Sequence, residues 1–240
     1  MQPTEPKILL QKKSMSHELV ELIKRKILSG ELNPGERIVE IKLAKEYGIS
    51  QSPVREAIRH LSGEGIVTIV PSKGPVVKKM EAADIFEIYS LRSSLEALAI
   101  HLTTQHASDE EIRELVEFYG QMGDWLHDET KPTLLKESLH LHQSIIQLSR
   151  HSRLIQVYES ISFQIQLVNR ILGMTSTKQK EYNDHRELIE ALVARDPASA
   201  EQIMRRHIQR SYQECMEVLR KNEASERREI GTSWFAEDPK

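Results

Sequence analysis

The 240 residues, 39% hydrophobic and 29% charged, supply enough apolar material for one or two packed domains and exclude wholesale disorder. The apolar runs are too short for a membrane span or a secretory signal, and the single cysteine, Cys215, excludes a disulfide framework, so we expect a cytoplasmic protein. The net charge of −3 hides an asymmetry, because residues 1–80 carry +5 and residues 81–240 carry −8, which suggests that only the first part meets a polyanion.

Proline and glycine divide the chain at about the same place. Between 33 and 75 they recur every few residues, so the elements there are expected to be short and tightly turned. From about residue 84 they become rare, and long stretches show apolar residues three and four apart. The sequence therefore predicts a mainly α-helical chain, with a first domain at 1–79, a helical domain at 80–222 and a charged tail at 223–240.

Three helices are predicted in the first domain, at 17–28, 40–47 and 53–62. Ser52 is expected to cap the third helix, and Pro53 to take its first position, where a missing N–H costs nothing. Arg55 and Arg59, four residues apart, share the face of this helix that lies opposite its apolar residues.

Two short helices joined by a tight turn, the second of them basic on its free face, are typical of a helix-turn-helix. The major groove of DNA admits one such helix, whose N-terminal residues offer donors to bases and phosphates. A β-hairpin predicted at 67–77, with Lys73 at its tip, completes the pattern of a winged helix. DNA binding is the interpretation favoured by this pattern, although a winged helix can also serve protein contacts alone.

The run from residue 32 to 77 resembles the winged-helix domain of GntR-family transcription regulators. The matching features are a Pro-Gly turn, Leu-Ala in the second helix, Gly-Ile-Ser, Pro-Val-Arg-Glu-Ala, Glu-Gly-Ile and a glycine-bearing wing. Arg59 is as consistent with a solvated charge or a salt bridge as with a DNA contact. The resemblance implies DNA contacts from the tip of the third helix and the wing: Ser50, Gln51, Ser52, Pro53, Arg55, Arg59, Lys73 and Gly74.

Two positions depart from the family pattern. Gln51 stands where the family most often has an arginine that reads guanine, and Ile41 stands where some relatives have another DNA-contacting arginine. Glutamine prefers adenine by bidentate geometry. The sequence therefore predicts an operator that differs from the usual one.

The second domain is predicted to contain helices at about 84–105, from 108 on, and at 133–149, 153–172, 178–195 and 197–220. Arg92 falls within the apolar row of the first of these helices. Because burying a guanidinium without a partner is costly, Arg92 must meet a carboxylate. Glu96, one turn on, and a bound anionic ligand are the two alternatives.

Three of the ten histidines are predicted to point inward from three different helices, namely His142, His185 and His207. His140, two residues from His142, is predicted to point outward. The inward histidines are either core residues bonded to backbone carbonyls or ligands of one divalent ion of the Zn or Ni type.

The spacing of these histidines resembles the C-terminal ligand-binding domain of the FCD subgroup of GntR regulators. The matching segments are Leu141-His142, the run 185–196, Ala200 and His207, and the Leu91-Arg92 to Glu96 stretch resembles the start of that domain. The resemblance implies a small carboxylate effector near the histidines, at Arg92, Glu96 and Ser138. Ser138 stands where the family has an aspartate ligand, so a reduced or absent metal affinity is predicted.

These features predict a transcription regulator, expected to be a repressor, and not an enzyme. A homodimer on a palindromic operator is expected, because one recognition helix covers about 4–5 base pairs, and two copies about 34 Å apart read a longer site. A metal-dependent hydrolase is an alternative, but it needs a general base beside the ion, and no HExxH or Asp-rich motif is present. A second alternative is a metal sensor, in which the ion itself is the signal.

Overall fold

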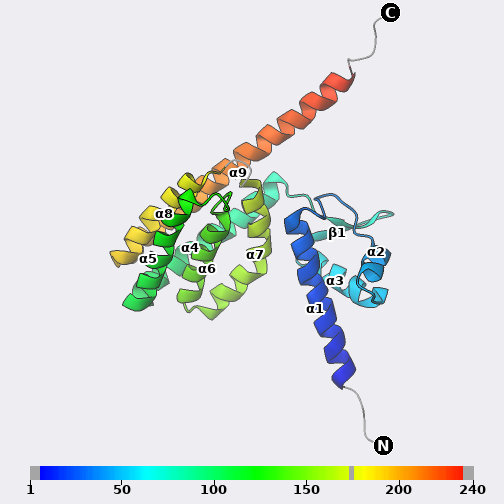
Figure 1. Cartoon of the computed structure of the whole chain (residues 1–240), viewed down its shortest axis with the longest axis horizontal. Helices are drawn as coiled ribbons and strands as arrows, with labels where there is room; N and C mark the ends of the chain where they lie inside the picture. The colour runs from blue at the N-terminus through cyan, green and yellow to red at the C-terminus, as the bar shows by residue number, and fades with distance from the viewer. Residues whose placement is uncertain (1–5, 173–175, 235–240) are drawn as a thin grey trace, which may run out of the picture. The chain divides into compact units, whose positions relative to one another are not determined.

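A computed structural model describes the backbone of residues 6–172 and 176–234 and the side chains of residues 15–171 and 176–221. The chain divides into two compact units, Met1–Met80 and Glu81–Lys240 (Figure 1). None of the described helices is both long and apolar enough to cross a membrane.

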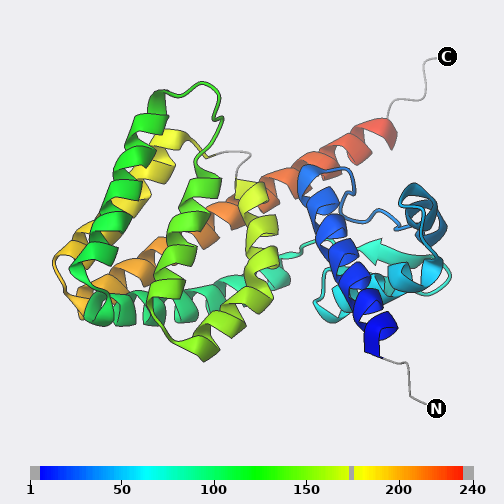
Figure 2. The same cartoon turned by 60° about the horizontal axis from the view of Figure 1, so that its bottom comes forward.

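The first unit is a winged helix. It contains α1 (Pro6–Ser29), α2 (Glu40–Glu46), α3 (Gln51–Gly63), β1 (Val67–Val70) and β2 (Gly74–Val77). The two strands form an antiparallel hairpin, seen as arrows in Figure 2, with Val67 opposite Val77 and Val70 opposite Gly74. Helix α1 packs against α3, and the buried residues come from both: Leu19, Val20, Ile23, Ile27, Val54, Ala57, Ile58 and Leu61.

The ends of α1 and α3 differ from the prediction. Helix α1 begins at Pro6, well before residue 17, because the residues between are mostly good helix formers although they lack the apolar stripe that guided the prediction. Helix α3 begins at Gln51 with Ser50 as its N-cap, so the expected start at Ser52-Pro53 is wrong. Pro53 still lies in the first turn, where its missing N–H leaves no hydrogen bond unmade.

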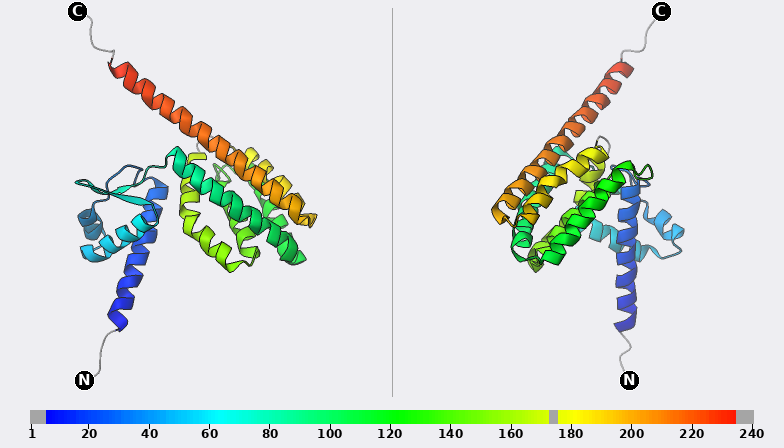
Figure 3. Two further views of the ribbon diagram at one scale, coloured as in Figure 1. Left: turned by 180° about the vertical axis from the view of Figure 1, so that it is seen from behind. Right: turned by 60° about the vertical axis from the view of Figure 1, so that its left-hand side comes forward.

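The second unit is a bundle of helices. It contains α4 (Ala82–His106), α5 (Asp109–Asp124), the 3-10 turn η1 (Trp125–His127), α6 (Leu135–Leu148), α7 (Ser152–Leu172), α8 (Lys178–Val193) and α9 (Pro197–Trp234). Helices α4 and α9 run side by side, as the left view of Figure 3 and the packing contacts show. Side chains from α4, α6, α8 and α9 fill the space between the helices: Ile100, Leu141, Ile145, Leu188 and Met204.

Side chains cap two helix starts in this unit. Ser108 and Glu111 form a capping box at the start of α5, in which the Glu111 backbone N–H donates to Ser108 Oγ and the Ser108 backbone N–H donates to Glu111 Oε2. Asp196 accepts from the Ser199 backbone N–H at the start of α9, and Pro197 is the first helical residue.

The end of α9 differs from the prediction. The helix continues to Trp234 through the segment expected to be a charged tail, while residues 235–240 lie outside the described part of the chain. Residues 220–230 are mostly Arg, Lys, Glu and Ala, which have high helix propensity. Charged helix formers without an apolar stripe therefore gave no periodic signal, although they favour a helix.

Candidate functional site

The N-terminal turn of α3 presents a polar, basic surface. The Arg55 side chain is 59% exposed, and its Nε donates to Glu40 Oε2 over 2.7 Å. Its Nη2 donates to Gln51 Oε1 over 3.1 Å, so one guanidinium links the start of α2 to the start of α3. Ser50, Ser52 and Arg59 are also exposed, whereas Pro53 is buried and shapes the tip rather than offering a surface.

The hairpin places a second basic group next to its turn. Lys73 is exposed at the turn, and the neighbouring Ser72 and Gly74 both have positive φ angles, +63° and +83°. The Arg37 guanidinium lies beside Gly74. A side-chain carbon added to this glycine would lie 3.7 Å from Arg37 Nε. Arg37 pairs by its backbone with Val76. No local sequence pattern marks Arg37, because only the backbone pairing with Val76 brings it next to the wing.

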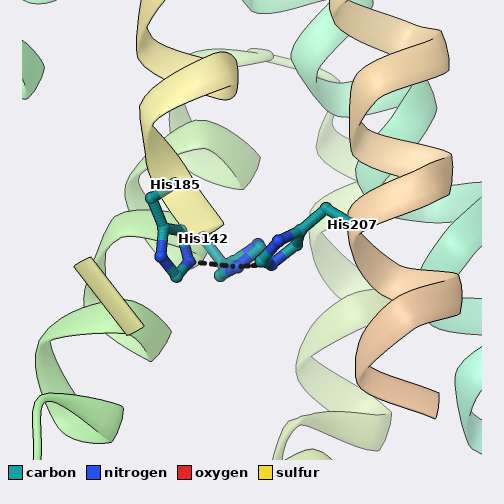
Figure 4. A group of neighbouring side chains, drawn as sticks. All are labelled: His142, His185 and His207. Atoms are coloured by element: carbon teal, nitrogen blue, oxygen red, sulfur yellow. Dashed lines mark hydrogen bonds between the residues drawn. The ribbon is translucent and has the colours of Figure 1, made fainter. Parts of the chain in front are cut away.

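The three inward histidines converge on one point (Figure 4). His142 comes from α6, His185 from α8 and His207 from α9, and each is at most 4% exposed. The Nε2 atom of His142 is 3.1 Å from Nε2 of His185 and 3.1 Å from Nε2 of His207. The predicted inward orientation is confirmed, and His140 is exposed on the opposite side of α6.

The opposite ring nitrogens of two histidines meet fixed acceptors. His185 Nδ1 donates to the Glu181 backbone carbonyl over 2.6 Å. His142 Nδ1 lies 2.6 Å from Glu96 Oε2, within ion-pair distance, although off the ideal angle for a hydrogen bond. Only His185 follows the expectation for an ordinary core histidine, since the neighbour of His142 is a carboxylate.

This arrangement suits a cation. With protons on Nδ1, His142 and His185 direct two Nε2 lone pairs at each other across 3.1 Å. The two lone pairs repel each other, and a metal ion bound between them would remove this repulsion. Burial, followed by the charge of His142, lowers the pKa of His185 to about 3, and burial lowers the pKa of His207 well below its usual value. Both rings are therefore neutral at pH 7, the state in which imidazole binds metals.

Arg92 and Glu96 form a buried ion pair behind the histidines. Arg92 Nε donates to Glu96 Oε1 over 2.6 Å, and the two side chains are 5% and 1% exposed. Burial alone would raise the pKa of Glu96, but the charges of Arg92 and His142 outweigh it and hold this pKa at about 2. Of the two partners expected for Arg92, Glu96 is thus the one present, while an anionic ligand remains a prediction.

A small polar cavity of about 40 Å³ adjoins the histidines. Ser138 lies on its wall, with Oγ 3.0 Å from His185 Nε2, so the hydroxyl stands beside the histidines where the family has a carboxylate. Glu96 is fully buried. The charged groups of the lining are Arg92, Lys180, Glu181, Asp184 and Glu214, and the Lys180 ammonium pairs with Asp184 and Glu214.

A larger groove of about 550 Å³ lies elsewhere on the bundle, between α5, α6 and α7. Its lining includes Glu111, Phe118 and His140, but none of the three inward histidines. We place the candidate ligand site at the small cavity, because buried Arg92, His185 and His207 line it, whereas the groove has no buried charged or histidine side chain in its lining.

Comparison with known proteins identifies both units. Residues 15–77 match the bacterial regulatory proteins of the gntR family, and residues 87–210 match the FCD domain. The chain is 30% identical over 200 residues to the uncharacterized HTH-type transcriptional regulator YdhC of Bacillus subtilis, which covers 82% of this chain and 89% of YdhC. It is also 30% identical over 193 residues to the Nta operon transcriptional regulator of Aminobacter aminovorans, covering 80% and 90% of the two chains.

Solved structures agree on the fold. The E. coli protein McbR/YncC superposes with a TM-score of 0.69 at 19% identity, over 85% of this chain and 97% of that one. The matched families and relatives are transcription regulators and not enzymes, which leaves the hydrolase alternative without support. The chain belongs to the GntR family of bacterial transcription regulators, with an FCD domain as its C-terminal unit.

Proposed function

We propose that this regulator binds operator DNA through the tip of α3 and the wing, and that a small carboxylate bound in the C-terminal unit controls this affinity. The observation that carries the proposal is the exposure of Arg55 at the start of α3, within the family's DNA-binding unit. Lys73 and Arg37 at the hairpin supply further cations of the kind that contact phosphates.

The proposed effector site is the small cavity beside the histidines. Arg92 uses Nε to hold Glu96, which leaves its terminal Nη groups for a ligand carboxylate, the anion that a guanidinium binds best. The cavity volume of about 40 Å³ favours a compact organic acid over a bulky one.

We further propose that His142, His185 and His207 hold a divalent metal ion of the Zn or Ni type. Three imidazoles with converging Nε2 atoms fit such an ion, and Ser138 Oγ lies beside them. When bound, the ion would supply a positive charge that attracts an anionic effector.

A homodimer completes the proposal. Leu91 and Leu98, seven residues apart on one face of α4, are 47% and 42% exposed, and Val157 on the neighbouring α7 is 46% exposed. A second copy that covers these side chains would bring two recognition helices to one palindromic operator. Replacing Leu91 and Leu98 by glutamate should turn a dimer into a monomer in light scattering.

The test is a DNA-binding titration of the full chain with sequences from beside its gene, with and without organic acids, at several salt concentrations. Each phosphate neutralised should contribute about 0.9 to the slope of log affinity against log salt. Loss of operator binding on adding an acid would show that the acid is an effector, and a response to metal alone would identify a metal sensor. Absence of sequence preference and a flat salt response would together refute the proposal.

A further inference from the structure

Glu96 contacts both parts of the candidate ligand site. Its Oε1 accepts from Arg92 Nε over 2.6 Å, and its Oε2 lies 2.6 Å from His142 Nδ1. All three side chains are at most 5% exposed. The buried Glu96 carboxylate therefore contacts both Arg92, which lines the cavity, and His142, one of the three converging histidines.

We propose that Glu96 is a positioning residue that fixes which nitrogen of His142 carries the proton and thereby prepares its Nε2 to bind a metal ion. The inference deepens the proposed function of this site and rests on it. Glu96 acts through His142 and Arg92, and its place behind them keeps it from the ion itself.

The chemistry of a carboxylate gives the reason. Ionised Glu96 can only accept hydrogen bonds, so the Nδ1 atom next to Oε2 must carry the proton. In the singly protonated ring, the form that binds a metal, the lone pair of His142 is then on Nε2, 3.1 Å from the Nε2 atoms of both other histidines. Carboxylates that hold a histidine in this way orient metal ligands and raise their basicity.

His185 reaches the same state by a different route. Its Nδ1 donates to the Glu181 backbone carbonyl, which no side-chain substitution removes. His185 therefore provides an internal reference within the same centre, because its tautomer should not depend on Glu96.

The substitution Glu96→Gln makes the proposal testable, because an amide has one acceptor oxygen where the carboxylate has two. Arg92 is a permanent cation and takes that oxygen, so the amide NH2 group is left facing His142. Nδ1 must then accept, the proton moves to Nε2, and the lone pair that the ion needs is lost.

The experiment measures histidine tautomers in the metal-free full-length protein by two-bond ¹H–¹⁵N correlation spectra. The wild-type chain should show His142 protonated on Nδ1, and Glu96→Gln should show it protonated on Nε2, with His185 unchanged in both. Titration with Zn²⁺ should show an affinity about 10–100-fold lower in the variant, the usual effect of losing such a partner. Glu137→Gln is the matched control, because this buried carboxylate pairs with Lys131 rather than with a histidine.

Glu96→Gln leaves the Arg92 charge without its partner, and the protein could unfold for that reason alone. A double variant removes this ambiguity. Arg92→Met with Glu96→Gln has no buried charge at this position, and the amide oxygen is free to accept from His142, so the Nδ1 tautomer should return. Wild-type His142 protonated on Nε2, or a tautomer and affinity unchanged in Glu96→Gln, would overturn the inference. Wild-type protein that binds no Zn²⁺ would count against the proposed metal site, while the tautomers still test Glu96.

Discussion

Arg55 donates a hydrogen bond from Nη2 to Gln51 Oε1 over 3.1 Å, one turn away on α3. This bond uses one lone pair of the glutamine oxygen and turns that oxygen toward Arg55, so we infer that the NH2 group is the part of the amide presented to a base. A glutamine that reads adenine must accept from the base and donate to it at once. The contact with Arg55 therefore changes the expectation for Gln51 from adenine to a base edge rich in acceptors, such as that of guanine.

Operator selection from randomised duplexes should show this preference. The wild-type chain is expected to enrich guanine at the position facing Gln51, and Gln51→Arg should keep guanine, because both side chains present only donors. Gln51→Glu presents only acceptors and should shift the preference toward cytosine, whose N4 donates. Enrichment of adenine by the wild-type chain would show that the bond to Arg55 breaks on DNA.

Arg55→Ala should weaken binding to the operator by about 1–3 kcal/mol or more, because one base contact typically contributes that much. The protein should remain folded, because the lost ion pair with Glu40 is largely exposed and such pairs contribute at most about 1 kcal/mol. Fluorescence anisotropy with operator and with unrelated duplex measures the effect, and circular dichroism checks the fold.

Arg113→Ala is the matched control for this variant, because it removes the same charge from an exposed position in the FCD domain. It should leave the affinity for operator unchanged. Equal affinity of the Arg55→Ala and wild-type chains would place the recognition surface elsewhere.

The sequence predicted the residues of the histidine centre better than their contacts. Helical spacing and the resemblance to the FCD subgroup were enough to point His142, His185 and His207 inward, because each lies among apolar residues on its own helix. The contact between Glu96 and His142 joins helices that are far apart in the chain, so no local pattern contains it. The same reasoning explains why Arg37 was missed, since only strand pairing brings it to Gly74.

Helix boundaries show a second limit of prediction from the sequence. The middle of each helix was predicted correctly, because apolar residues recur every three or four positions where a helix packs on a core. The sequence gives no such signal at the start of α1 and the end of α9, where the residues are mostly good helix formers. At α3 the capping serine was misplaced, because Ser50 and Ser52 offer the same cap chemistry two residues apart.

Glu111→Gln should lower the melting temperature at pH 7 but not at low pH. The Ser108 backbone N–H and then Arg150 hold the pKa of Glu111 below its ordinary value of 4.5. A lowered pKa in the folded state stabilises the protein above pH 4.5, and this stabilisation is lost as the pH falls through the folded-state pKa. Melting curves from pH 7 to pH 3 should therefore converge for the two chains.

Glu117→Gln is the control for this pH series, because Glu117 is an exposed carboxylate on the same helix, away from the capping box. Its melting temperature should follow that of the wild-type chain at every pH. A Glu111→Gln difference that persisted unchanged at pH 3 would assign the effect to packing and not to the carboxylate charge.

Ser138→Asp should raise the affinity for Zn²⁺ or Ni²⁺ by about tenfold or more, roughly 1.4 kcal/mol. Ser138 Oγ is 3.0 Å from His185 Nε2, so a carboxylate at this position reaches the converging histidines and adds an anionic ligand to the three imidazoles. Ser144→Asp places the same charge on α6 outside this group and should leave the affinity unchanged. Calorimetric titration of the metal-free proteins measures both changes. Equal affinities for wild-type and Ser138→Asp would mean that the histidines do not form the metal site, because a carboxylate this close to a bound ion must change its affinity.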